Sequence, residues 1–131
     1  MTPTLEEAAL GLVGTPFRLH GRDPARGLDC VGLIAEALRR AGHRPIAPEG
    51  YRLRTLSLEP WLALAGASGL EPVANGGNVI LARIHALQPH LAVLVPGGLV
   101  HAHAGIGRVT FLPGDPPWPI ERRWRLAKPE T

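Results

Sequence analysis

The fold of this chain is predicted around residues 27–34, GLDCVGLI, where a helix start coincides with the single cysteine of the sequence. Asp29 is a favourable N-cap residue, and the apolar residues after it recur with the 3.6-residue period of a helix packed on a core. These residues are Leu33, Ile34, Ala37 and Leu38. Cys30 would lie in the first turn, where unpaired backbone N–H groups carry partial positive charge. We therefore expect this position to favour the thiolate, which is the nucleophilic form of cysteine.

Length and composition predict one domain over residues 1–131, long enough to bury a core without disulfides. Fourteen basic and 11 acidic residues give a net charge of +3, and the excess is not gathered into one run. Nucleic acid is therefore not an expected partner. A single cysteine excludes an internal disulfide, and no Cys/His spacing resembles a structural zinc site. We expect no cofactor.

The N-terminal sequence predicts no export signal, because residues 1–7, MTPTLEE, are acidic and lack an apolar export region. No apolar run approaches the roughly 20 residues that are needed to span a bilayer. We therefore expect synthesis in the cytoplasm without a signal peptide, and no membrane partner.

The first half of the chain has the pattern of helices joined by loops. A capping box at residues 4–7, TLEE, starts a helix that runs to about residue 13. The loop over residues 17–28 leads to the Cys30 helix, which Gly42 terminates. A third helix is predicted from residue 57 to about residue 67.

From Asn75 onward the pattern changes to short strands separated by turns. Strands are predicted at residues 79–84, 90–95, 99–104, 108–112 and 120–126. Helices first and strands second are typical of an α+β domain with helices packed on one face of an antiparallel sheet. Trp118 and Trp124 either pack in the core or line a groove, and we expect core packing.

Two of these strands bring histidines together. If their connecting loop has two residues, His90 lies on the same face as His101 and His103, whereas a three-residue loop would place them on opposite faces. Gly97 and Gly98 permit the tight turn, so we expect the shared face. A thiol at a nearby helix terminus would complete a chain of nucleophile, base and orienting group. On geometry alone, His101 and His103 compete for the third role.

Alternatives exist for the same residues. Imidazole suits zinc, so His90, His101 and His103 together form a candidate metal site. No carboxylate falls at an obvious ligand position, however, and a metal would leave Cys30 without a role, so we expect none. A lone cysteine is also typical of a small buried core residue.

Four motifs together resemble the NlpC/p60 family of cell-wall cysteine peptidases. They are GTPFRL at 14–19, GLDCVGL at 27–33, HLAV at 90–93 and VHA at 100–102. Their order and spacing resemble the family over about residues 4–126. The resemblance implies a papain-like fold with N-terminal helices packed on a roughly five-stranded antiparallel sheet. With Val31 after the cysteine, the motif resembles that of the phage tail-assembly and prophage-encoded members of the family.

The resemblance also implies residue roles and a substrate. Cys30 would be the nucleophile, His90 the general base and His101 the orienting residue. The backbone N–H of Cys30 would help to bind the oxyanion. The scissile bond would be an amide in peptidoglycan stem peptides, commonly between D-glutamate and a diamino acid. The protein would act at the cell wall as part of a tail particle, with phage tail proteins as partners.

The candidate substrate-binding residues include departures from the family pattern. Phe17 stands where the family usually has tyrosine, Val31 replaces serine, and His20 occupies a position that is usually glycine. With Asp29 and His103, these residues form our predicted substrate-binding set. The missing tyrosine hydroxyl motivates one alternative, a catalytically weak structural phage-tail component that kept the fold. A papain-like acyltransferase, a second alternative, would share the thiol signature and differ in its acceptor.

Overall fold

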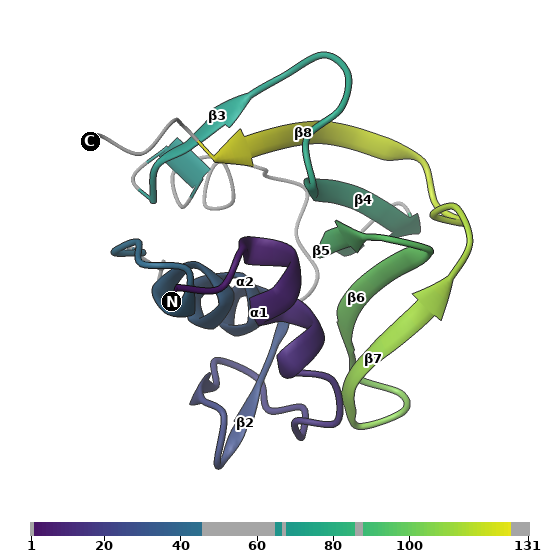
Figure 1. Ribbon diagram of the computed structural model, residues 1–131. Coiled ribbons are helices and arrows are strands. Elements are labelled where there is room, and N and C mark those ends of the chain that lie inside the picture. Colours follow the sequence, from purple (N-terminus) through teal and green to yellow (C-terminus); the bar gives the residue numbers. More distant parts are fainter. Residues whose placement is uncertain (1, 46–64, 67, 86–87, 127–131) are drawn as a thin grey trace.

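The structure is a computed structural model that describes residues 2–45, 65–66, 68–85 and 88–126. Within these residues, α1 (Leu5–Gly11) and α2 (Cys30–Arg40) pack on one face of a six-stranded antiparallel sheet (Figure 1). The sheet order is β3-β8-β4-β5-β6-β7. The strands are β3 (Leu70–Pro72), β4 (Val79–His85), β5 (Gln88–Val95), β6 (Gly98–His103), β7 (Arg108–Pro113) and β8 (Ile120–Leu126). The predicted α+β class is confirmed.

Three very short strands differ from the prediction. β3 adds a sixth strand to the sheet by pairing with β8, and β1 (Arg22–Asp23) pairs with β2 (Gly27–Leu28) inside the expected loop. Strands of two or three residues have no periodicity that a sequence pattern can show. Of the predicted third helix, residues 65 and 66 are helical, and residues 57–64 and 67 lie outside the described residues.

The start of each helix follows the predicted capping. In α1 the Glu7 N–H donates to Thr4 Oγ1 at 3.1 Å, and the Thr4 N–H donates back to Glu7 Oε1 at 3.0 Å. This confirms the capping box, although α1 ends at Gly11 rather than near Val13. In α2 the Asp29 carboxylate accepts from the Gly32 N–H at 2.8 Å, so the predicted N-cap is confirmed as well.

Asp29 also fastens the preceding loop to the start of α2. Its fully buried carboxylate accepts a second hydrogen bond from the His20 N–H at 2.8 Å and pairs with the Arg22 guanidinium at 3.2 Å. Three donors from the loop and the helix thus converge on one side chain. The position of Cys30, the next residue, depends on this junction.

Replacement of Asp29 is therefore expected to destabilise the protein. Asp29→Ala removes the N-cap acceptor of the buried Gly32 N–H, which should lower the free energy of unfolding by about 2 kcal/mol. Urea denaturation measures this loss. Asp29→Asn is the matched control. It keeps an oxygen that can accept from the Gly32 N–H, so its loss of stability should be less than half of the loss in Asp29→Ala. Equal stability of Asp29→Ala and the wild type would contradict this role.

The apolar side chains form two clusters on opposite faces of the sheet. The main core fills the space between the helices and the sheet, with Leu33 and Ile34 of α2 against Leu91, Val93 and other strand residues. A smaller cluster on the other face is formed by Ile80, Ala82, Ala92 and Leu99, with Leu94, Leu112, Trp118 and Ile120 packed against it. Adjacent strand residues alternate between the clusters, as a β pleat requires.

The hairpin of β5 and β6 has the predicted two-residue turn. Val95 pairs with Gly98, so the loop consists of Pro96 and Gly97, and Gly97 has a φ of +83° that suits glycine. With this register, His90 and His101 fall on the same face of the sheet and are diagonal to each other. The expected shared face is confirmed.

Candidate active site

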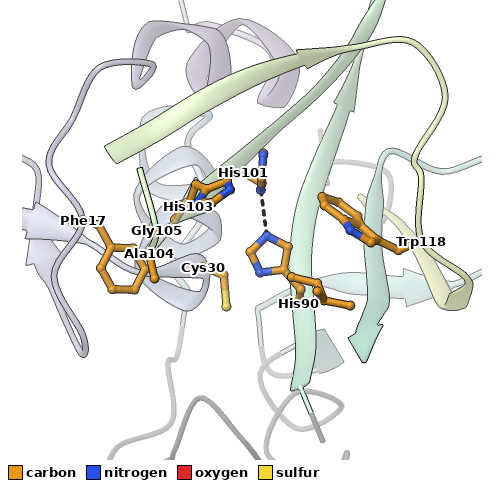
Figure 2. A pocket seen from close by; sticks show the side chains of 10 residues that line it. Phe17, Cys30, His90, His101, His103, Ala104, Gly105 and Trp118 are labelled. Atoms are coloured by element: carbon orange, nitrogen blue, oxygen red, sulfur yellow. Dashed lines mark hydrogen bonds between the residues drawn. The ribbon is translucent and has the colours of Figure 1, made fainter. Parts of the chain in front are cut away.

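A cavity of about 240 Å³ lies where the start of α2 meets β5 and β6 (Figure 2). Four of its lining residues carry a thiol or an imidazole: Cys30, His90, His101 and His103. The others are Phe17, Ile84, Ala102, Ala104, Gly105 and Trp118. Within the described chain, this lining contains no carboxylate, lysine or arginine. The cavity is therefore mostly apolar, with a few polar groups converging on it, which is the usual character of a ligand site.

His90 and His101 form a hydrogen-bonded pair of imidazoles. Nε2 of His90 lies 2.9 Å from Nδ1 of His101, and the rings are perpendicular. Both side chains are buried, with 6% and 4% of their surface exposed. If Nδ1 of His90 is to accept a proton, Nε2 must carry the hydrogen and donate it to His101. His101 would then hold His90 in the tautomer and orientation that a base needs.

Cys30 and His90 approach the cavity from different elements. Cys30 is the first residue of α2, and His90 lies on β5, 60 positions later in the sequence. Figure 2 shows the second ring nitrogen of His90, Nδ1, on the side of the ring where Cys30 lies. Among the contacts of the described residues, no hydrogen bond joins this thiol to His90. Catalytic hydrogen bonds are often long before substrate binds, so the arrangement is compatible with a nucleophile–base pair.

The Cys30 thiol is protonated at neutral pH in this structure. Burial raises its pKa to about 12, and the negative charge of Asp29 contributes to the increase. Backbone hydrogen bonds from Leu91 and Val31 lower the pKa by less. The start of α2 therefore acts in the predicted direction but is outweighed by desolvation. The expectation of a resting thiolate is wrong.

Both buried imidazoles are neutral at neutral pH. Burial, with smaller contributions from charge on His101 and His103, lowers the pKa of His90 to about 3. Burial, with a smaller contribution from charge on His103, lowers the pKa of His101 to about 4. A neutral imidazole is the form that can accept a proton. The resting site thus holds a neutral thiol beside a neutral base.

These shifts predict that the protein loses stability in acid. The His90 pKa falls from 6.5 in the unfolded chain to about 3 in the folded protein, so between these values only the unfolded state binds the proton. The free energy of unfolding should therefore fall as the pH falls from about 7 to about 3, by up to about 1.4 kcal/mol per pH unit for this group. Urea denaturation across this range measures the slope. His90→Gln should flatten it.

An unchanged slope in His90→Gln would show that His90 is not held neutral by burial.

Trp118 lines the cavity, which corrects the expectation of core packing, whereas Trp124 is buried in the main core as expected. The Trp118 ring packs edge-on against both imidazoles, with centroids 5.5 Å from His90 and 5.3 Å from His101. Prolines at positions 116, 117 and 119 surround it in the sequence, which is a signal for a stiff loop. That signal does not say where the ring lies. Trp118 is half-buried and packs against the smaller apolar cluster.

The structure brings together five of the predicted site residues and leaves three outside the cavity lining. Phe17, Cys30, His90, His101 and His103 line the cavity. His20, Asp29 and Val31 are not among the described lining residues. His20 is exposed on the loop and has a φ of +62°, while Asp29 and Val31 are completely buried. The predicted contact of these three residues with substrate stays a prediction.

The described residues contain no group of three His, Cys, Asp or Glu side chains arranged to hold a metal ion. No helix in the described part of the chain is long and apolar enough to cross a membrane.

The fold is similar to that of a solved structure, the NlpC/p60 domain of the peptidoglycan hydrolase SagA. The TM-score is 0.55, with 21% sequence identity over 84% of this chain and 86% of that chain. No protein-family model matches the sequence, and no curated protein matches it. The likeness confirms the predicted papain-like NlpC/p60 fold. Residue roles and activity do not follow from it.

Proposed function

We propose that this protein is a cysteine peptidase that hydrolyses amide bonds in peptidoglycan stem peptides. The observation that carries the proposal is the shared cavity of Cys30, at the start of a helix, and the hydrogen-bonded pair of His90 and His101. Nucleophile, base and orienting group are the three parts of a thiol hydrolase. The likeness to the SagA domain supports the choice of peptidoglycan as substrate.

The reaction begins with proton transfer from the Cys30 thiol to Nδ1 of His90 as the sulfur attacks the carbonyl carbon. The tetrahedral intermediate collapses when the His90 imidazolium protonates the departing amine, leaving a thioester on Cys30. His90 then takes a proton from water, which attacks the thioester. As the second tetrahedral intermediate collapses, the carboxylic acid is released and the His90 imidazolium returns the proton to the Cys30 sulfur. Throughout, Nε2 of His90 donates to Nδ1 of His101, which fixes the ring and stabilises its charged form.

The neutral resting pair determines when charge appears in the site. Burial disfavours both the thiolate and the imidazolium, so the free protein does not hold them as an ion pair at neutral pH. Proton transfer is coupled instead to bond formation with a substrate in the cavity. The negative charge then moves to the substrate oxygen, which the backbone N–H of Cys30 and the positive end of the α2 dipole stabilise.

A panel of defined muropeptides tests the proposed activity. We expect the wild-type protein to cleave an amide within the stem peptide and to release a new amino terminus, which mass spectrometry of the products identifies. Muropeptides that stay intact under all conditions would contradict the proposal. The proposed setting, a phage-tail particle acting at the cell wall, is based on Val31 in the cysteine motif and is tested by co-purification with tail proteins.

A second candidate is a structural tail component that kept the fold with little activity. The raised pKa of the Cys30 thiol and the phenylalanine at position 17 favour it. It predicts intact muropeptides together with stable binding to a tail partner. An acyltransferase, in contrast, would convert the same acyl group into a product that carries a new amine or alcohol acceptor. Analysis of the reaction products separates the three candidates: a hydrolysed peptide, an unchanged peptide, or an acyl group on a new acceptor.

A further inference from the structure

The third imidazole of the cavity, His103, is held in place by the turn after β6. Its Nδ1 accepts a hydrogen bond from the Ile106 N–H at 3.0 Å. A neutral ring with Nδ1 as acceptor carries its hydrogen on Nε2. With Nδ1 accepting from the Ile106 N–H, His103 therefore presents an N–H donor at Nε2. Unlike the buried pair of His90 and His101, it is partly exposed, so a ligand can reach it.

Close packing fixes the position of this ring. A Cβ atom added to Gly105 would lie 3.0 Å from Cε1 of His103, so the ring rests directly on the glycine. On its other side the ring packs against His101, with centroids 5.4 Å apart. A donor that is held by the turn can bind a ligand with little loss of side-chain entropy.

The charge around His103 favours an anionic ligand. The described lining of the cavity carries three imidazoles and no acidic side chain that would repel an anion. A bound carboxylate would accept a charge-assisted hydrogen bond from Nε2 of His103, because the acceptor is ionised. It would also make the imidazolium form of His90 easier to reach during the reaction.

We propose that Nε2 of His103 binds a carboxylate of the substrate beside the scissile amide, which makes His103 a specificity-determining residue. This inference rests on the proposed function, since it places an amide substrate in the cavity. It predicts that substrates with a free carboxylate at this position are preferred over their carboxamides.

Binding to an inactive protein tests this inference apart from catalysis. In the Cys30→Ala background, calorimetry compares the binding of two dipeptides. One is γ-D-glutamyl-L-lysine, and the other is the same dipeptide with the α-carboxylate of its glutamyl residue replaced by a carboxamide. We expect the carboxylate to bind on the order of tenfold more tightly. His103→Asn should abolish this preference, because its Oδ1 can still accept from the Ile106 N–H but Nε2 is gone. His43→Gln is the matched control and should keep the preference, and thermal unfolding checks that both variants fold.

Equal binding of the two dipeptides, a preference that survives in His103→Asn, or no binding of either dipeptide would overturn the inference. These outcomes are distinct from failure of the proposed function, which is shown by muropeptides that the wild-type protein leaves intact. A carboxylate preference that depends on His103 in a protein without hydrolytic activity would support the binding site and reject the peptidase.

Discussion

Replacement of Cys30 by alanine is expected to abolish cleavage of purified muropeptides. The substitution removes the atom that forms the thioester, and loss of a catalytic nucleophile lowers turnover by about 10⁴-fold or more. Cys30 fills a small buried site, so alanine should leave the fold intact. Chromatographic detection of muropeptide products over time measures the loss. His90→Gln should cause a loss of similar size, because the two side chains act as a unit.

His43→Gln provides the matched control for the histidine variant. His43 follows the end of α2 and is not among the described residues that line the cavity. We expect this variant to cleave at the wild-type rate. Cleavage that persists in Cys30→Ala would mean that the sulfur is not the nucleophile and would end the peptidase mechanism.

Gly32→Ala is expected to destabilise the protein by about 3 kcal/mol or more and to remove activity with it. A Cβ atom at Gly32 would lie 2.0 Å from the backbone oxygen of Gly21, a separation that no rotamer change can relieve. The loop must move away from α2, which breaks the junction at Asp29 and shifts Cys30. Thermal and urea unfolding, followed by the muropeptide assay, measure both effects.

Gly66→Ala is the matched control for this substitution. Gly66 is also helical, and a Cβ atom there would meet no heavy atom within 4 Å. Because alanine favours the helix over glycine, this variant should equal or exceed the wild type in stability. Wild-type stability of Gly32→Ala would contradict the close approach of the loop to α2.

The parts of the fold that could be predicted are those with strong local signals. The capping box of α1, the Asp29 N-cap and the two-residue turn at Gly97 each depend on neighbouring residues, and all three are confirmed. β3 could not be predicted in the same way. Its three residues, Leu70 to Pro72, join the sheet by pairing with β8, and the paired residues lie 52 to 56 positions further along the chain.

The main residues of the candidate site could be predicted from the sequence, but the protonation state of Cys30 could not. The pleat and the turn length placed His90 and His101 on one face, and the structure joins them by a hydrogen bond. The state of Cys30 depends on how much water reaches it, which is decided by packing from β5 and the distant loops. For the same reason, the sequence could not place Trp118 beside the imidazoles.

Mass spectrometry of the intact protein, quenched with acid during muropeptide turnover, tests the account most directly. We predict an adduct with the mass of the acyl half of the substrate, located on Cys30 by peptide mapping and missing from Cys30→Ala. Turnover by a protein whose Cys30 stays unmodified at every quench time would contradict the account.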